Sequence, residues 1–421
     1  MAEVEIPSYF LCPISLQIMR DPVTLPTGIT YDRDSIERWM FSGKHNTCPV
    51  TKHHLPDCEL TPNHTLRRLI QAWCVLNSSN DIERFPTPKP PIGKARIAEL
   101  LDDARLPHLQ LGSLRKLKEV VSESERNRRC VEATPGVVHT LLSIIHNNNN
   151  NSSGTTTSGE EGIPIADDVE STNARDEALS ILYLLQLSEQ HLLDLAVGNG
   201  DFIESLTSIL QRSNHQTRAY ATLLLKSMLG VIAPARLAGV REELFEEVVG
   251  VLRDRVSHKA TKAALQVLAW LCPWGRNRIK AANAGAVPVL VELLLDVLER
   301  RVCELVLVVL DRVCGCAEGR AELAGHAAGI AIVSKKILRV SEAASERAVK
   351  ILNSVARFSA TKAVLQEMLQ IGVVSKLCLV LQADCGMKTK EKAREILRLH
   401  SRFWKKSPCL SPQLLISYPS S

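Results

Sequence analysis

This sequence of 421 residues has few aromatic residues and no large excess of positive or negative charge. Phenylalanine, tyrosine and tryptophan make up only 4% of it while leucine is abundant, and this composition is typical of stacked helices. The formal net charge is +5, from 51 basic and 46 acidic residues spread along the chain, so no basic stripe stands out. We therefore do not expect nucleic acid as a partner.

Targeting and membrane segments are also lacking. The N-terminus, "MAEVEIPSYF", has no basic region followed by an apolar run, and no later segment offers the roughly 18 uncharged apolar residues of a membrane span. We expect a soluble, cytoplasmic protein without a transmembrane segment. In that compartment the twelve cysteines are expected to be reduced thiols.

Closely spaced pairs of metal ligands are the third absence. A cross-braced zinc module needs about eight Cys and His ligands, delivered in pairs such as C-x2-C. Three positions after Cys12 and Cys48, where partners would be needed, "CPIS" and "CPVT" supply Ser15 and Thr51. We therefore expect no metal ion and no cofactor. The first 78 residues contain these cysteines and histidines: Cys12, Cys48, Cys58, Cys74, His45, His53, His54 and His64.

The N-terminal region mixes strand and helix signals. The short β-favouring runs "VTL" and "ITY" are joined by Pro26-Thr27-Gly28, which predicts a hairpin with Gly28 at a positive φ. Asp32 or Asp34 can cap a following helix, which contains Trp39. A second helix is expected after Pro62-Asn63, with one apolar stripe packed on the hairpin. That stripe consists of Leu66, Leu69, Ile70 and Trp73.

A repeat becomes visible from about residue 94. Helices aligned on a shared leucine are separated by 41, 43, 42, 42 and 45 residues, and periods near this value are typical of armadillo and HEAT solenoids. Gly285, Gly329 and Gly372 recur at 44 and 43 residues, each opening an apolar helix. The aligned leucines are Leu184, Leu225, Leu268, Leu310, Leu352 and Leu397.

Three segments differ in composition from these two regions. Residues 80–93 include "RFPTPKPP" and predict a stiff, proline-rich linker before the repeats of residues 94–406. Residues 146–173 are polar and asparagine-rich, which predicts a disordered insertion between repeats. Residues 407–421 form a C-terminal tail.

The order of motifs in the first region resembles the U-box. "LCPISLQIMRDPVTLPTGITYDRDSIERWM", "CPVTK" and "LTPNHTLRRLIQAW" follow one another as they do in that family, over residues 5–79. With the armadillo array behind it, the chain resembles the plant U-box/armadillo ubiquitin ligases, particularly the subgroup linked to immune and stress signalling. The resemblance implies a small α+β U-box of RING-like topology without metal, followed by an all-α, right-handed superhelical solenoid.

The resemblance also implies a site. In the family, two Cys-Pro loops and the central helix receive a ubiquitin-conjugating enzyme that carries ubiquitin as a thioester. Ile14, Leu16, Trp39 and Pro49 match the groove positions, although the helical phase of Trp39 also permits plain core packing. Such anchors suit a transient interface.

Lys52 matches a position where a cation, more often Arg, bridges the conjugating enzyme and ubiquitin. A solvated surface lysine is the alternative, because Lys lacks the planar fork of Arg. No covalent nucleophile is expected. Cys12 and Cys48 precede prolines, and no His or basic cluster at matched spacing indicates a lowered thiol pKa. The implied activity is that of a RING-type E3 ubiquitin transferase, which works by positioning its partners.

The helical array is expected to recruit the protein substrate. Armadillo proteins that grip extended peptides carry an Asn on successive inner helices, but the matching positions here differ. "CPWGRNR" at 272–278 is either a contact patch for an acidic partner or a capped turn. The positions that replace the Asn ladder are Ser227, Trp270, Arg312 and Ser354.

Two other functions fit part of the sequence. The first is a non-catalytic armadillo adaptor or scaffold, which has no need to retain Ile14, Trp39 and Pro49. The second is a zinc-dependent interaction module, which metal analysis would reveal. Homo-oligomerisation through the U-box is left open.

Overall fold

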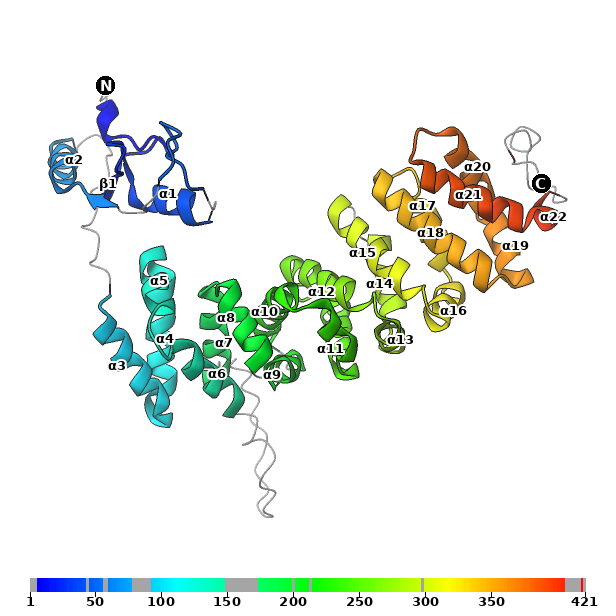
Figure 1. The fold of residues 1–421 in the computed structure, drawn as a ribbon, viewed down its shortest axis with the longest axis horizontal. Coiled ribbons are helices and arrows are strands. Elements are labelled where there is room, and N and C mark those ends of the chain that lie inside the picture. Colours follow the sequence, from blue (N-terminus) through cyan, green and yellow to red (C-terminus); the bar gives the residue numbers. More distant parts are fainter. Residues whose placement is uncertain are drawn as a thin grey trace, which may run out of the picture. The chain divides into compact units, whose positions relative to one another are not determined.

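The structure is a computed structural model of the chain (Figure 1), and two compact units are described separately. One unit comprises residues 1–144 with 184–186, and the other comprises residues 145–183 with 187–421. The described residues are 6–42, 45–55, 60–77, 92–147, 173–198, 201–211, 214–296, 299–405 and 418.

A small antiparallel sheet forms the centre of the N-terminal domain. Strands β1 (Pro22–Thr24) and β2 (Thr30–Asp32) pair with Val23 opposite Tyr31, and β3 (Thr61–Pro62) lies on the other side of β1. The predicted hairpin is confirmed. Its loop requires glycine at Gly28, where φ is +81°.

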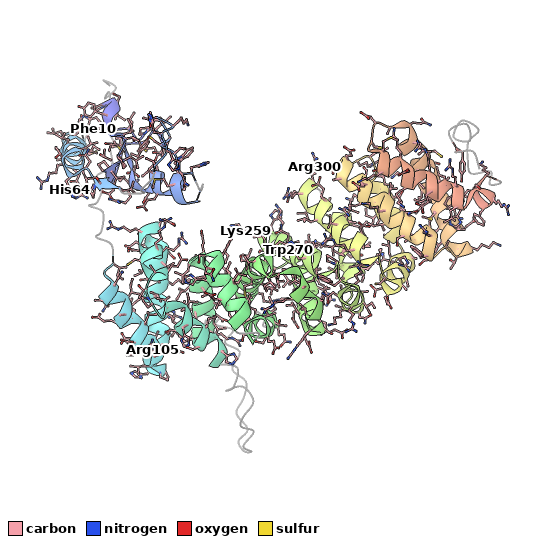
Figure 2. All side chains as sticks on the ribbon, in the orientation of Figure 1. Phe10, His64, Arg105, Lys259, Trp270 and Arg300 are labelled. Atoms are coloured by element: carbon pink, nitrogen blue, oxygen red, sulfur yellow. The ribbon has the colours of Figure 1, made fainter. Side chains whose placement is uncertain are left out.

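Helices surround this sheet. A 3-10 turn, η1 (Ser8–Phe10), precedes it, and α1 (Arg33–Glu37) continues into a π-helical turn, η2 (Arg38–Ser42). The longer helix α2 (His64–Leu76) follows β3, with Asn63 Oδ1 accepting a hydrogen bond from the N–H of Leu66 at 3.0 Å. Most side chains of this domain can be followed in Figure 2, which labels Phe10 and His64.

The predicted cap of the first helix is wrong in its chemistry. Asp32 stands at the N-cap position of α1, but its side chain makes no capping bond. Its Oδ1 instead accepts from the N–H groups of Arg20 at 2.7 Å and Asp21 at 3.0 Å. The carboxylate that was predicted to cap the helix is therefore occupied by backbone N–H groups twelve and eleven residues away.

The predicted stripe of α2 is only partly correct. Ile70 is buried, and Leu66 and Trp73 pack against the core, but Leu69 is 53% exposed. In so small a domain, α2 buries only a narrow face, and Leu69 lies beyond it. The core that the helix covers includes Phe10, Val23, Tyr31, Ile36 and Ile70.

Ion pairs tie the hairpin to both helices. Asp21 Oδ2 lies 2.6 Å from Arg33 Nε, and its Oδ1 lies 3.5 Å from Arg67 Nη1 on α2. Arg33 also reaches Glu37 at 3.6 Å. Because these groups are mostly shielded from water, the charge-assisted hydrogen bonds hold α1 and α2 against the hairpin.

The remainder of the described chain is helical, as Figure 1 shows. The helices are α3 (Lys94–Arg105), α4 (Pro107–Glu123), α5 (Glu125–Glu132), α6 (Val137–Asn147), α7 (Ala174–Leu184), α8 (Glu189–Gly198), α9 (Asp201–Leu210), α10 (His215–Val231), η4 (Pro234–Gly239), α11 (Glu242–Arg253), α12 (His258–Leu271), α13 (Gly275–Asn283), α14 (Ala286–Asp296), α15 (Arg300–Val313), α16 (Ala317–Gly325), α17 (Gly329–Lys336), α18 (Glu342–Phe358), α19 (Lys362–Gln370), α20 (Val373–Gln382), α21 (Met387–Leu399) and α22 (Ser401–Trp404).

In the second unit, one helix of each repeat packs beside its equivalent in the next repeat. The resulting helix row consists of α10, α12, α15, α18 and α21. The aligned leucines of this row are fully buried, which confirms the period, whereas Leu184 on α7 is only partly buried. The buried set is Leu225, Leu268, Leu310, Leu352 and Leu397.

The recurring glycines serve two different purposes. Gly285 and Gly372 adopt positive φ values of +75° and +76°, which end one helix and begin the next. At Gly329, by contrast, a Cβ atom would lie 2.1 Å from the carbonyl oxygen of Leu323. Glycine is needed there because the backbone of α17 approaches the preceding helix closely.

The predicted linker and insertion fall mainly outside the described residues. Of 80–93, only Ile92 and Gly93 are described, directly before α3. Helix α6 continues to Asn147, so the first two residues of the predicted insertion are helical, and 148–172 are not described. The domain boundaries stay predictions.

One residue of the predicted C-terminal tail is described. Tyr418 is buried, and its hydroxyl donates to the carbonyl oxygen of Leu397 at 2.6 Å. The ammonium group of Lys405 lies 4.9 Å from the ring centroid. This part of the tail therefore packs on α21.

Among the described residues, no single helix is long and apolar enough to cross a membrane. Only together do α19 and α20, bent by 63° relative to each other, have the length and composition of a span. Met368 of α19 and Leu377 of α20 are fully buried in the repeat core.

Candidate functional site

Two loops of the N-terminal domain share one backbone design. In the first, the N–H of Cys12 donates to Gln17 O at 2.8 Å and the N–H of Leu16 donates to Cys12 O at 2.8 Å. In the second, Cys48 N–H donates to His53 O at 2.9 Å and Lys52 N–H to Cys48 O at 2.9 Å. A β-bridge closes each loop, Leu11 to Ile18 and Thr47 to His54.

The two loops also share an unusual residue conformation. Leu16 and Lys52, each four positions after the cysteine, have φ values of 56° and 58°. A left-handed conformation costs a non-glycine residue roughly 1 kcal/mol, so the turn hydrogen bonds must hold it in place. Both side chains are exposed, Leu16 to 74%.

The cysteine thiols are buried beneath the loops and hydrogen-bonded differently. Cys12 Sγ accepts from the N–H of Asp32 at 3.3 Å. Cys48 Sγ lies 3.1 Å from the hydroxyl of Tyr31 and accepts from the hydroxyl of Thr27 at 3.5 Å. Hydroxyl groups therefore surround the second thiol, and backbone N–H groups the first.

These donors change the acidity of both thiols. Burial by itself would raise the pKa of Cys48, but hydrogen bonds from Thr27, Thr51 and Tyr31 outweigh it and lower the pKa to about 6. The pKa of Cys12 is also lowered, since backbone N–H groups outweigh its burial. The expectation that neither thiol pKa is lowered was wrong. Neutral hydroxyl and amide donors cause the change, not a basic cluster.

Acidity does not make these thiols reachable. Both cysteine side chains are fully buried, so a thioester carried by another protein cannot approach them. Among the described residues, no three or more His, Cys, Asp or Glu side chains gather where they could hold a metal ion. The thiols act as acceptors that fix the loops to the hairpin.

Trp39 joins the helix to the second loop. Its indole N–H donates to Thr47 O at 2.9 Å, and its ring stacks on His45 with 4.2 Å between centroids. Lys52 Nζ lies 5.8 Å from the ring centroid. Trp39 is partly buried and packs against the core, so it both supports the domain and contributes surface.

The other predicted site residues surround this tryptophan to different degrees. Lys52 lies beside it, and Ile14 packs against the same core cluster. Leu16 is largely exposed, and Pro49 is half-buried at the start of the second turn. We call Ile14, Leu16, Trp39, Pro49, Val50 and Lys52 the loop face.

Two residues near the site were not identified from the sequence. Val50 is 52% exposed and takes in "CPVT" the place that Ile14 takes in "CPIS". Aligning the two motifs with each other would have revealed it. His45 had no such signal, because its stacking depends on how the chain returns to Trp39 after the helix.

The positions that replace the Asn ladder lie on the helix row. The hydroxyl of Ser227 donates to Leu223 O at 3.1 Å, and that of Ser354 to Cys314 O at 2.9 Å. Ser227 thus satisfies a carbonyl group of its own helix, and Ser354 one at the end of α15. Trp270 and Arg312 remain partly exposed.

The capping interpretation of "CPWGRNR" is supported for two of its residues. Asn277 is buried and donates to Leu237 O at 2.7 Å and Leu271 O at 3.0 Å. Arg278 donates to Cys272 O at 2.9 Å, at the end of α12. These side chains satisfy carbonyl groups that the helix end leaves free. Arg276 is exposed.

Comparison with protein families agrees with both regions. Residues 6–79 match the model described as the U-box domain. Residues 96–420 match the model described as the plant U-box protein ARM repeat region.

Among curated proteins, three from Arabidopsis thaliana match along their length. E3 ubiquitin-protein ligase PUB23 is 53% identical over 99% of this chain and 98% of its own, and PUB22 is 52% identical over 99% of both. PUB24, another E3 ubiquitin-protein ligase, is 38% identical over 98% of this chain and 96% of its own.

A solved structure shows the same fold. It comes from work on a conserved phosphorylation switch that controls the interaction between cadherin and beta-catenin. The likeness has a TM-score of 0.57 and covers 80% of this chain and 59% of that chain, at 13% identity. At such identity it bears on the stacked-helix architecture alone.

Proposed function

Because this chain belongs to the plant U-box proteins with an armadillo-repeat region, we propose that its loop face binds a ubiquitin-conjugating enzyme carrying ubiquitin. The chain is an E3 ubiquitin-protein ligase of the RING type. A non-catalytic adaptor is therefore not the function supported. Ile14, Leu16, Trp39, Pro49 and Val50 supply apolar contact area of the kind that anchors transient interfaces.

The proposed mechanism is positioning. With the thiols of Cys12 and Cys48 buried, neither serves as a nucleophile in this proposal, and the substrate lysine attacks the thioester directly. Binding the conjugating enzyme beside the substrate removes much of the entropic barrier to that attack. Lys52 is the proposed bridging cation, supported by its exposure on a fixed turn beside Trp39.

The helix row is the proposed recruiting surface for the protein substrate. Its support is the family match over residues 96–420 and the row of neighbouring helices, each with a face that is at least partly exposed. Stacked repeats of this kind provide extended surfaces for protein partners.

Homo-oligomerisation through the U-box is a further part of the proposal. Leu69 and Leu76 lie seven positions apart on α2, and they are 53% and 81% exposed. Apolar side chains on one helix face favour contact with another protein surface.

We place this activity in the cytoplasm and in plant immune or stress signalling. The described cysteines are free thiols, which suits a reducing compartment. The signalling role rests on the subgroup that the sequence resembles.

The observation that carries this proposal is the shared design of the two loops around Trp39 within a matched U-box. The test is ubiquitin transfer by the purified full chain with activating enzyme, conjugating enzyme, ubiquitin and ATP. We expect ubiquitin chains on the ligase itself, dependent on the loop face. Transfer that persists when Trp39, Leu16 and Val50 are all replaced by Ala would contradict the assignment of the interface.

A further inference from the structure

Charges along the exposed face of the helix row are largely paired with one another. Lys262 on α12 lies 2.7 Å from Glu299, before α15. Arg347 on α18 lies 2.8 Å from Asp311 on α15, and the next pair, Arg357 with Glu395, is 3.0 Å apart. Charged side chains of neighbouring repeats thus neutralise each other where adjacent helices meet.

Arg312 departs from this pattern. In the described part of the chain, its Nη1 atom is buried without any hydrogen-bond partner. The carboxylate beside it, Asp311, is engaged by Arg347. A guanidinium that is partly withdrawn from water and left without an acceptor is costly, so its retention calls for an explanation.

The surroundings of Arg312 hold charges of both signs. Burial lowers the pKa of its guanidinium, Cys272 and Asp311 oppose this, and the nearby cations Arg347 and Arg278 add to it. Arg278 is itself a cation with donors only, and it donates to Cys272 O and Pro273 O. A carboxylate that approaches the partly exposed side of the guanidinium would give Arg312 an acceptor and offset the nearby cations.

On the neighbouring helix, Trp270 occupies the position equivalent to Arg312. Trp270, labelled on α12 in Figure 2, packs over Gly230 of α10, where a Cβ atom would lie 3.3 Å from Cη2 of the indole. Glycine at 230 therefore makes room for the ring, which remains partly exposed. The ring offers an apolar platform one repeat away from the unpaired guanidinium.

We propose that the exposed face of α12 and α15 binds an extended acidic segment of the substrate, with an Asp or Glu carboxylate on Arg312 and an apolar side chain on Trp270. This inference rests on the proposed function of the helix row and adds the chemical class of its ligand. A protein segment is favoured because an aromatic platform beside a guanidinium suits neighbouring apolar and acidic side chains.

The spacing of the two anchors sets a sequence rule. Packed helices lie about 8–10 Å apart, and an extended chain advances about 3.3 Å per residue. The apolar and acidic residues of the ligand should therefore stand about three positions apart.

The test uses a displayed library of short random peptides, selected on the immobilised full-length protein. We expect enrichment of Asp or Glu about three positions from a large apolar residue. A synthetic peptide of the most enriched sequence should then lose affinity about tenfold or more for Arg312→Glu. Arg312→Gln, which keeps donors but removes the charge, should lose less.

A matched control is available on the same unit. Arg253→Glu makes the same change of charge at an exposed arginine of α11, outside the helix row, and should leave peptide affinity unchanged. Trp270→Ala should abolish the preference for the apolar residue while acidic enrichment persists. Thermal unfolding of each variant must match the wild type, and Arg312→Gln serves if Arg312→Glu does not fold.

Three results would overturn the inference: no peptide binder, selected peptides without acidic enrichment, or equal affinity for wild type and Arg312→Gln. The ubiquitin-transfer reaction separates this failure from failure of the proposed function. Chains formed on the ligase without a bound peptide would leave the function intact, whereas their absence would contradict the function itself.

Discussion

The two Cys-Pro loops of the U-box have nearly the same backbone and different chemistry. Both close with the same pair of turn hydrogen bonds, and both force the fourth residue after the cysteine into a left-handed conformation. That residue is apolar in the first loop, Leu16, and cationic in the second, Lys52. The frame is therefore set by local hydrogen bonds, while function is set by the side chain that the frame turns outward.

The loops also differ in what holds them from behind. The first thiol accepts from backbone N–H groups, whereas hydroxyl groups of Thr27 and Tyr31 surround the second. Among the described hydrogen bonds, the indole N–H of Trp39 donates to Thr47 O at the second loop, and none joins Trp39 to the first loop. We expect damage at the second loop to disturb the interface more than the same damage at the first.

The largest expected effect is on the stability of the U-box, which should change with pH because of Cys48. Its pKa in the folded state, about 6, lies below the ordinary value of 9.0, so folding favours the thiolate. The contribution is complete above the unfolded-state pKa and is lost as the pH falls through the folded-state value. Between about pH 6 and 9, wild type should gain on the order of 3 kcal/mol relative to Cys48→Ala. Urea unfolding read by proteolysis of the U-box measures this.

Cys12→Ala provides the comparison within the same domain. The pKa of Cys12 is lowered by backbone N–H groups against its burial, so its pH dependence should have the same sign. A chelator should leave the midpoint of all three proteins unchanged, because the thiols serve as hydrogen-bond acceptors. A pH-independent difference at Cys48, or unfolding by the chelator, would contradict this account.

Trp39→Ala should have the next largest effect, now on activity. Loss of an interface anchor costs on the order of 2 kcal/mol or more, roughly thirtyfold in affinity for the conjugating enzyme. His45→Ala removes only the stacking partner and should weaken binding less. Affinity and ubiquitin transfer are measured together, with thermal unfolding as the control for folding. Normal transfer by a folded Trp39→Ala protein would reduce Trp39 to a core residue.

Local features of the U-box were predictable from the sequence, and distant ones were not. The hairpin followed from "PTG" between two β-favouring runs. The donors to the Asp32 carboxylate were misassigned, because the N–H groups of Arg20 and Asp21 approach it only after the hairpin has formed. The acidity of Cys48 was missed for the same reason, since Thr27 and Tyr31 are 21 and 17 residues away.

The repeat region shows the same division. The period of its leucines and the turn glycines Gly285 and Gly372 could be identified by counting. The unpaired state of Arg312 could not, because it depends on Arg347 of the next repeat engaging Asp311. The repeat period identified the position of Arg312, but only the pairing of Arg347 with Asp311 showed that Arg312 lacks a partner carboxylate among the described residues.

Replacing the outward apolar residues of the two loops should have a smaller effect on affinity for the conjugating enzyme. Leu16→Ala and Val50→Ala each remove exposed apolar surface, so stability should change by no more than about 0.5 kcal/mol. Affinity for the conjugating enzyme should fall by about fivefold for each. Tyr9→Ala, at a 63% exposed position outside the loop face, should have no effect. If only one loop variant weakens binding, the conjugating enzyme uses a single loop.

The smallest and most selective effect should come from Lys52, because binding and thioester activation are separate steps. A bridging cation acts on the reactive geometry, so Lys52→Ala should slow single-turnover discharge of ubiquitin about fivefold, roughly 1 kcal/mol, with little change in affinity for the uncharged enzyme. Lys52→Met retains the stem beside Trp39 and should be equally slow. Lys52→Arg should match or exceed wild type, since a guanidinium donates to two acceptors at once.

Moving the charge from one loop to the other completes the comparison. Leu16→Lys combined with Lys52→Ala places a cation on the same left-handed turn of the first loop, with the net charge of wild type. If the backbone frame alone determined the role of this position, discharge would recover. We expect no recovery, because Lys52 lies beside Trp39 at 5.8 Å and the second loop is tied to that ring through Thr47. Full recovery would mean that the loops are interchangeable, and equal rates for wild type and Lys52→Ala would remove Lys52 from the mechanism.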